Sequence, residues 1–529
     1  MTLQYDAIIV GSGPAGISVA FPLVKSGMRV LMVDGGKCKR IEPPVESFLD
    51  YRIKQSNQWK WMIGDDFSAL RNMSTNSPKL RIPIHQYVFE DFNKENHIVT
   101  KNFESIGSLS TGGLSNAWGC GIAAESEEEM LKFPCDPLDL IRSYQTVARR
   151  IGISGRVRDD MSDYFGVDAW SQAPIKADAL HEYLIGNYEA HPDKANRHGL
   201  RIGRARIAVL SEDHMGRQAC KLSGNCLWGC HQRSLYSSID ELPMLTAYSN
   251  FKIIKGLIVD RIDPEGGGWS ISGRRQNNNE KQIEHGKILI LAAGTLASTR
   301  IVLTALNSKE RVRLLFTPTA AFLLWLPRLM GQKRISAFGY AQSAYRIKIN
   351  KCDNAFGWLF STNGIPVSEF TRYLPLKRPL RVEVLRSILS SCIVGNIFFP
   401  GSMSAAEAWV NEAQELCITG GFSDSFPEVL SKVRKKIMKG FRSLNAVMIP
   451  GSFQTAKPGS DIHYTGTLPM QENPRICQTK GTGEVYGTEG LYVVDGACLP
   501  SSSEKAHTLT IMANADRVGK LIAQKFKPN

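Results

Sequence analysis

The stretch that decides the fold is residues 7–16, which read AIIVGSGPAG. Four apolar residues, mostly β-branched, predict a short buried strand, and the glycines that follow predict a tight turn. A helix-like segment then continues to Gly27, and a second apolar strand at residues 30–33 ends on Asp34. The order strand, glycine turn, helix and strand predicts a βαβ unit with a parallel pair of strands.

The glycine turn predicts a dinucleotide site. In the pattern G-x-G-x-x-G the first glycine allows the turn, the second lets the backbone approach a pyrophosphate, and the third lets helix and strand pack closely. The helix N-terminus offers free N–H groups to the diphosphate, and an acid at the end of the second strand suits the ribose hydroxyls. The residues expected to contact the dinucleotide here are Gly11, Gly13, Pro14, Ala15, Gly16 and Asp34.

Composition indicates a globular chain with several domains. Of its 529 residues 43% are hydrophobic and 22% are charged, which excludes intrinsic disorder. The net charge of +14 favours anionic partners without choosing among them. The basic run at residues 432–439 lacks an aromatic platform or a nucleic-acid motif, so we expect an exposed helix face and no nucleic-acid partner.

The first residues contain no basic segment followed by an apolar one, and the eleven cysteines are mostly dispersed. We therefore expect a cytoplasmic protein. The longest charge-free apolar run, residues 314–327, is interrupted by Pro318 and is shorter than the ~20 residues that span a bilayer. Basic and apolar stretches alternate between residues 305 and 450, which favours a core element with solvated flanks and leaves peripheral membrane contact as an alternative.

Motifs near the end of the chain carry a family resemblance. His463 begins the pattern H-x-x-G-T-x-x-M, residues 490–500 read GLYVVDGACLP, and residues 506–513 read AHTLTIMA. Together with the glycine turn, the loop GGLSNAWG at residues 112–119 and the strand end AAG at residues 292–294, their order resembles the glucose-methanol-choline (GMC) oxidoreductase superfamily. The resemblance is closest to its bacterial FAD-dependent sugar and alcohol dehydrogenases.

The resemblance implies an α/β fold, α+β overall, with a Rossmann-like FAD-binding domain and a substrate-binding domain built on an antiparallel sheet. The implied FAD domain is discontinuous, comprising residues 1–40, 105–135, 200–305 and 450–529. Residues 305–450, with parts of 40–105 and 135–200, would form the substrate domain. Beyond the glycine turn, the implied FAD contacts are Gly113, Asn116, Trp118, Ala293, Gly294, Asp495 and Thr508.

The resemblance places His463 and His507 in the active site. Oxidation of an alcohol needs a base for the hydroxyl proton while hydride leaves for flavin N5, and a neutral imidazole suits that role near pH 7. Which histidine is the base stays open. We expect a dehydrogenase acting on a sugar or sugar-like polyol. An oxidase that uses oxygen, a lyase that keeps FAD as a structural element, and a flavin-containing docking protein without turnover are the alternatives.

A three-cysteine window, Cys220, Cys226 and Cys230, is similar to the cluster loop of the FAD-dependent sugar dehydrogenases. Three thiolates suit a [3Fe–4S] cluster, which would relay electrons to a protein or quinone acceptor. A purely structural loop is an almost equal alternative, and a zinc site that includes His231 is a weaker one.

Overall fold

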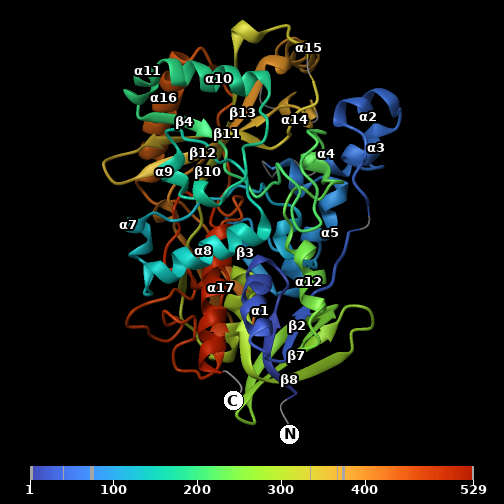
Figure 1. Ribbon diagram of the computed structural model, residues 1–529, viewed down its shortest axis with the longest axis vertical. Helices are drawn as coiled ribbons and strands as arrows, with labels where there is room; N and C mark the ends of the chain where they lie inside the picture. Colours follow the sequence, from blue (N-terminus) through green and yellow to red (C-terminus); the bar gives the residue numbers. More distant parts are fainter. Residues whose placement is uncertain are drawn as a thin grey trace.

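The computed structural model describes residues 4–39, 41–71, 77–333, 335–365, 367–371 and 376–526. Two large sheets lie at opposite ends of the long axis, and the first strand and the last helix of the described chain both lie at the first sheet (Figure 1). A third, four-stranded sheet completes the architecture.

The first sheet contains the predicted βαβ unit. Its strands are β1 (Tyr5–Val10), β2 (Val30–Asp34), β5 (Phe251–Lys255), β6 (Leu257–Glu265), β7 (Gly268–Arg275), β8 (Lys281–Leu291) and β18 (Leu491–Val493). The order is β5-β2-β1-β8-β7-β6, and β18 pairs with β8. Strand β1 runs parallel to both β2 and β8, with Ala7 opposite Val30. The parallel strand pair predicted from the glycine turn is therefore confirmed.

Helices α1 (Pro14–Lys25) and α17 (Thr508–Lys525) cover one face of this sheet. They pack closely because Gly519 has no side chain: a Cβ there would lie 2.6 Å from Cγ of Pro22. Helix α13 (Thr295–Ala305) packs on the other face, where Ile8 and Val10 point. The alternation of β1 side chains between two cores explains why residues 7–10 of the strand are all apolar.

The second sheet is antiparallel throughout. Its strands are β4 (Leu200–Arg204), β10 (Thr319–Trp325), β11 (Ala341–Lys348), β12 (Asn354–Ser361), β13 (Cys392–Phe398), β16 (Val447–Met448) and β17 (Gln454–Thr455). Helices α10 (Ala179–Ala190) and α16 (Phe426–Ser443) cover one face, where Phe322 and Tyr345 contact Phe441. The predicted class, α/β with a second domain on an antiparallel sheet, is confirmed.

The third sheet has the order β3 (Ile98–Lys101), β15 (Leu416–Thr419), β14 (Ala406–Val410) and β9 (Val312–Leu314). Its buried side chains share a core with α13 of the first sheet, although β9, β14 and β15 lie in the range assigned to the substrate domain. Conversely, β4 and β17 lie in ranges assigned to the FAD domain and pair with the second sheet. The domain ranges themselves stay a prediction.

The remaining α-helices are short except α8 and α15. They are α2 (Phe48–Lys54), α3 (Gln58–Ile63), α4 (Ser68–Arg71), α5 (Gln86–Phe89), α6 (Phe92–Glu95), α7 (Glu127–Met130), α8 (Pro137–Ile151), α9 (Ser162–Phe165), α11 (Pro192–Asn196), α12 (Leu242–Thr246), α14 (Ser368–Thr371) and α15 (Arg378–Ile388). Within the described ranges, none of the helices combines the length and the apolar character needed to cross a membrane. Half of the apolar run at residues 314–327 is strand β10.

Candidate active site

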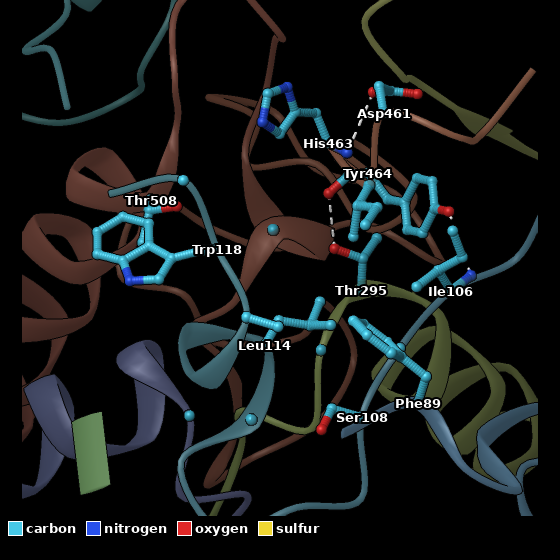
Figure 2. A pocket seen from close by; sticks show the side chains of 18 of the residues that line it. Phe89, Ile106, Ser108, Leu114, Trp118, Thr295, Asp461, His463, Tyr464 and Thr508 are labelled. Atoms are coloured by element: carbon cyan, nitrogen blue, oxygen red, sulfur yellow. Dashed lines mark hydrogen bonds between the residues drawn. The ribbon is translucent and has the colours of Figure 1, made fainter. Parts of the chain in front are cut away.

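A cavity of about 540 Å³ lies between the first and second sheets. The β1–α1 turn, the loop at residues 112–119, the start of α13 and the segment at residues 460–464 all contribute to its wall. Figure 2 shows part of this wall, with Trp118 and Thr508 on one side and Asp461 and Tyr464 on the other. Its volume is in the range of small-molecule and cofactor sites.

The three glycines of the turn have different surroundings. A Cβ on Gly11, where φ is +104°, would collide with the carbonyl of Ala292, and a Cβ on Gly16 would collide with the carbonyl of Gly11. A Cβ on Gly13 would meet nothing within 4 Å. Gly11 and Gly16 therefore serve the turn and its packing, whereas Gly13 leaves open space in the cavity wall beside Pro14 and Ala15. The open space at Gly13 and the free N–H groups of α1 fit a dinucleotide pyrophosphate.

Asp34 lines the cavity but is already fully hydrogen-bonded. Its Oδ2 accepts from the Ser12 hydroxyl at 2.5 Å and the Ser12 N–H at 3.2 Å, and its Oδ1 accepts from the Thr111 hydroxyl and the Gly36 N–H, both at 2.8 Å. These donors fill the four acceptor positions of a carboxylate. Asp34 thus ties the glycine turn to the neighbouring loop, and a ribose would have to replace one of the hydroxyl donors.

The loop at residues 112–119 lies directly against the glycine turn. A Cβ on Gly113 would lie 3.2 Å from Cα of Gly13. Asn116 does not line the cavity. Its side-chain amide donates to the carbonyls of Thr111 and Gly113 at 2.9 and 3.1 Å and so stabilises the loop. Trp118 does line the cavity, and its indole N–H donates to the carbonyl of Tyr236 at 2.7 Å.

Asp495 connects the end of β18 to the start of α13. Its carboxylate accepts from the N–H of Gly294 at 2.9 Å, from the Ser298 hydroxyl at 2.5 Å and from the N–H of Ala497 at 3.0 Å. Burial raises the pKa of Asp495 to about 6. Ala293, Gly294, Asp495 and Thr508 all lie in the cavity wall, so these four predicted contacts are brought together.

The two predicted histidines lie side by side. The rings of His463 and His507 meet edge to face, with centroids 4.7 Å apart, and the ring of Phe398 is 5.0 Å from that of His463. Burial lowers the pKa of His463 to about 4, and burial followed by the neighbouring His463 lowers the pKa of His507 well below its usual value. Both imidazoles are therefore neutral at pH 7. Nδ1 of His507 is buried and has no hydrogen-bond partner among the described residues.

Two residues that the sequence interpretation missed contact His463. The hydroxyl of Thr317 lies 2.8 Å from Nδ1 of His463 and donates to the carboxylate of Asp461 at 2.9 Å. Asp461 also accepts from the backbone N–H of His463 at 3.1 Å (Figure 2). An acid two residues before His463 could have been noticed in the sequence, whereas nothing in the sequence around Thr317 indicates this contact.

One face of the second sheet forms the far wall of the cavity. Alternate residues of β10, β12 and β13 point into it because strand side chains alternate between faces. These residues are Thr319, Ala321, Trp358, Phe360, Val394, Asn396 and Phe398. This wall is mostly aromatic or aliphatic, and its hydrogen-bonding groups are the side chains of Thr319 and Asn396 and the indole N–H of Trp358.

The three-cysteine window lies outside the cavity wall. Cys226 is buried and its sulfur accepts from the N–H of Gly339 at 3.2 Å, while Cys220 and Cys230 are partly exposed. Within the part of the chain that the structure describes, no three His, Cys, Asp or Glu side chains are arranged to hold a metal ion. The iron–sulfur cluster and the zinc site with His231 therefore stay predictions.

The comparisons with known proteins agree with this arrangement. Residues 430–515, which include both histidines and Asp495, match the C-terminal domain family described as GMC oxidoreductase. The solved structure of pyridoxine 4-oxidase from Mesorbium loti shares the fold with a TM-score of 0.61 and 13% identity, covering 99% of each chain. No curated protein sequence matches the chain. The fold is thus that of the GMC oxidoreductases, and this fold together with the C-terminal domain match supports an FAD-dependent oxidoreductase enzyme.

Proposed function

We propose that this protein oxidises an alcohol group, with FAD lying along the cavity from the glycine turn to the two histidines. The observation that carries the proposal is the pair of neutral imidazoles, His463 and His507, in a cavity whose wall also contains the open position at Gly13. The unpartnered Nδ1 of His507 supports the same reading, because a buried polar atom needs a partner that a ligand can supply.

Different residues of the chain would bind the cofactor and transfer the proton. Gly13, Pro14 and Ala15 would hold the pyrophosphate, and Gly113, Trp118 and Asp495 would surround the flavin half. When bound, FAD supplies the oxidant that accepts hydride at flavin N5. One of the two histidines takes the hydroxyl proton on a ring nitrogen, and the other orients the hydroxyl or stabilises the developing alkoxide.

The substrate side of the cavity refines the expected substrate. The resemblance favours a sugar or polyol, which would need several hydrogen-bonding side chains around it. The wall formed by the second sheet offers Thr319, Asn396 and the indole N–H of Trp358 among aromatic and aliphatic surfaces such as Phe360 and Phe398. This lining favours an alcohol with an apolar or aromatic body over a polyol, because unpaired polar groups are costly to bury.

Anaerobic titration tests the function. Purified protein loaded with FAD is mixed, without oxygen, with matched panels of polyols and of aromatic or aliphatic alcohols, and bleaching of the flavin absorbance is recorded. We expect bleaching by members of the second panel. Bleaching by polyols alone would restore the sugar assignment, and no bleaching by any alcohol would favour the lyase or the docking protein.

The acceptor of the electrons is a separate proposal. A dehydrogenase would pass electrons to a quinone or a partner protein, whereas an oxidase would pass them to oxygen. Readmitting air to the bleached enzyme separates the two, since rapid reoxidation with stoichiometric peroxide indicates an oxidase. Slow reoxidation in air with fast reoxidation by a soluble quinone indicates a dehydrogenase.

A further inference from the structure

We propose that Asp461 and Thr317 are positioning residues that hold His463 in one tautomer, with the proton on Nδ1 and an open lone pair on Nε2. This inference rests on the proposed function, because the open lone pair matters only if His463 receives a proton from a substrate. Neither residue lies in the sequence motifs described above.

The direction of the hydrogen bonds follows from counting protons. Oδ2 of Asp461 lies 2.9 Å from the hydroxyl oxygen of Thr317, and a carboxylate only accepts, so the hydroxyl proton points to Asp461. The hydroxyl has no second proton for Nδ1 of His463, which lies 2.8 Å away. Nδ1 must therefore carry the proton and donate it to Thr317. A neutral imidazole has only one N–H, so Nε2 is left as an acceptor.

The backbone is built to hold this chain of contacts. Oδ2 of Asp461 also accepts from the backbone N–H of Thr317 at 2.9 Å and of His463 at 3.1 Å. Reciprocal bonds of 2.9 Å between Leu315 and Thr465 bring the two segments together. Three donors on one oxygen fix the carboxylate, so Thr317 has a fixed acceptor for its proton.

Ile462, between the acid and the histidine, gives a second indication. Its φ is +65°, in the left-handed region that a β-branched residue rarely adopts. This conformation allows the carboxylate of Asp461 to turn back to the N–H of His463, whose ring lies beside His507. Strain of this kind persists where the surrounding contacts over-determine the backbone, and it concentrates at functional sites.

The arrangement depends on the charge of Asp461. Burial raises the pKa of this acid to about 6, so it is ionised at pH 7. The titratable groups around it are His463, the adjacent Tyr464, and Glu104, which accepts from Ser460. Residues 314–319, which include Thr317, contain no titratable side chain. When Asp461 is protonated, its carboxyl O–H can donate to the Thr317 hydroxyl, and that hydroxyl can then donate to Nδ1 of His463. The single proton of the neutral imidazole then lies on Nε2, which no longer has a lone pair to accept a proton from a substrate.

The inference therefore predicts a pH effect that differs from titration of the histidine itself. Flavin reduction should slow as the pH falls through about 6, where Asp461 becomes protonated. Protonation of His463 itself would instead lower the rate of flavin reduction nearer to its own pKa of about 4. If Asp461 had only a structural role, the rate of flavin reduction would not fall near pH 6.

The test uses the holoenzyme and two measurements. Nitrogen NMR of ¹⁵N-histidine-labelled protein, with His463 assigned by comparison with His463→Gln, reports the tautomer directly. Rapid mixing with a bleaching alcohol gives the reduction rate between pH 5 and 8. We expect Nδ1–H in the wild type, a rate roughly 10- to 100-fold lower in Thr317→Val with FAD still bound, and recovery to within about threefold in Thr317→Ser, which restores the hydroxyl. The limb near pH 6 should disappear in Asp461→Asn.

Thr304→Val is the matched control, because the hydroxyl oxygen of Thr304 on α13 is buried and has no hydrogen-bond partner among the described residues, and it should leave the rate and the pH profile unchanged. Wild-type protein with the proton on Nε2 would overturn the inference, as would Thr317→Val with the wild-type rate and profile. If no alcohol bleaches the flavin, the proposed function fails, while the NMR measurement still decides the tautomer.

Discussion

The rings of His463 and His507 lie edge to face with centroids 4.7 Å apart, although one follows β17 and the other immediately precedes α17. This proximity couples their protonation, because a charge on His463 further disfavours a charge on His507. Both rings are therefore neutral before the reaction, and a proton taken up by one ring makes protonation of the other less favourable.

This coupling predicts how histidine variants behave. Changing either His463 or His507 to Ala should slow flavin reduction roughly 10²- to 10⁴-fold with FAD retained, as expected for a lost acid–base group. The double variant should lose less than the product of the two single effects, because residues acting as a unit are not additive. Rapid-mixing kinetics measures this, with exposed His191→Ala as the control. Wild-type rates in both single variants would remove the pair from the mechanism.

Gly13→Val should separate folding from cofactor binding. Gly13 has φ of −67°, and a Cβ there meets nothing within 4 Å, so the fold accepts the side chain while the cavity loses the space for a pyrophosphate. We expect a thermal unfolding midpoint close to that of FAD-free wild type and loss of most bound flavin by absorbance. Gly186→Val on α10 also meets open space and should keep its flavin. Full flavin content in folded Gly13→Val would mean that the pyrophosphate lies elsewhere.

Glu125 should make stability depend on pH. Burial, followed by repulsion from Glu129, raises the pKa of Glu125 to about 8, although Ser503 donates to it at 3.1 Å. Between pH 4.5 and 8 the unfolded chain releases this proton and the folded chain keeps it. The free energy of unfolding should therefore fall as the pH rises through this window, by up to about 1.4 kcal/mol per pH unit, because folding keeps Glu125 protonated.

Glu125→Gln should therefore flatten the fall in stability across that window, measured as urea midpoints from pH 5 to 8. Glu128→Gln on the exposed side of α7 is the matched control. An unchanged slope in Glu125→Gln would show that other groups set the pH dependence.

Metal removal tests the iron–sulfur prediction for Cys220, Cys226 and Cys230. Because Cys226 is held by the N–H of Gly339 and by packing, we expect chelation under anaerobic conditions to leave stability and flavin bleaching unchanged. Near-stoichiometric iron in anaerobically purified protein, with a paramagnetic signal lost in Cys226→Ser, would establish the cluster instead and require the loop to rearrange around it.

The sequence predicts most of what depends on local pattern. The βαβ unit follows from residues 7–34 because strand, turn and helix signals are all local, and both histidines follow from motifs. The contact of Thr317 with His463 could not be predicted, since it depends on the antiparallel bridge between Leu315 and Thr465. The pairing of β4 with β11 was missed for the same physical reason: sheet partners distant in the chain leave no periodicity of their own.

The close contact of Gly519 with Pro22 joins the last described helix to the first. During synthesis at roughly 5–20 residues per second, the face of α1 that α17 will cover stays exposed on the ribosome for on the order of a minute. The nascent chain therefore cannot complete its first domain before α17, residues 508–525, has been synthesised. Premature termination before residue 508 should yield an aggregation-prone product that chaperones must hold, even though β1, β2 and β8 of the first sheet have been made.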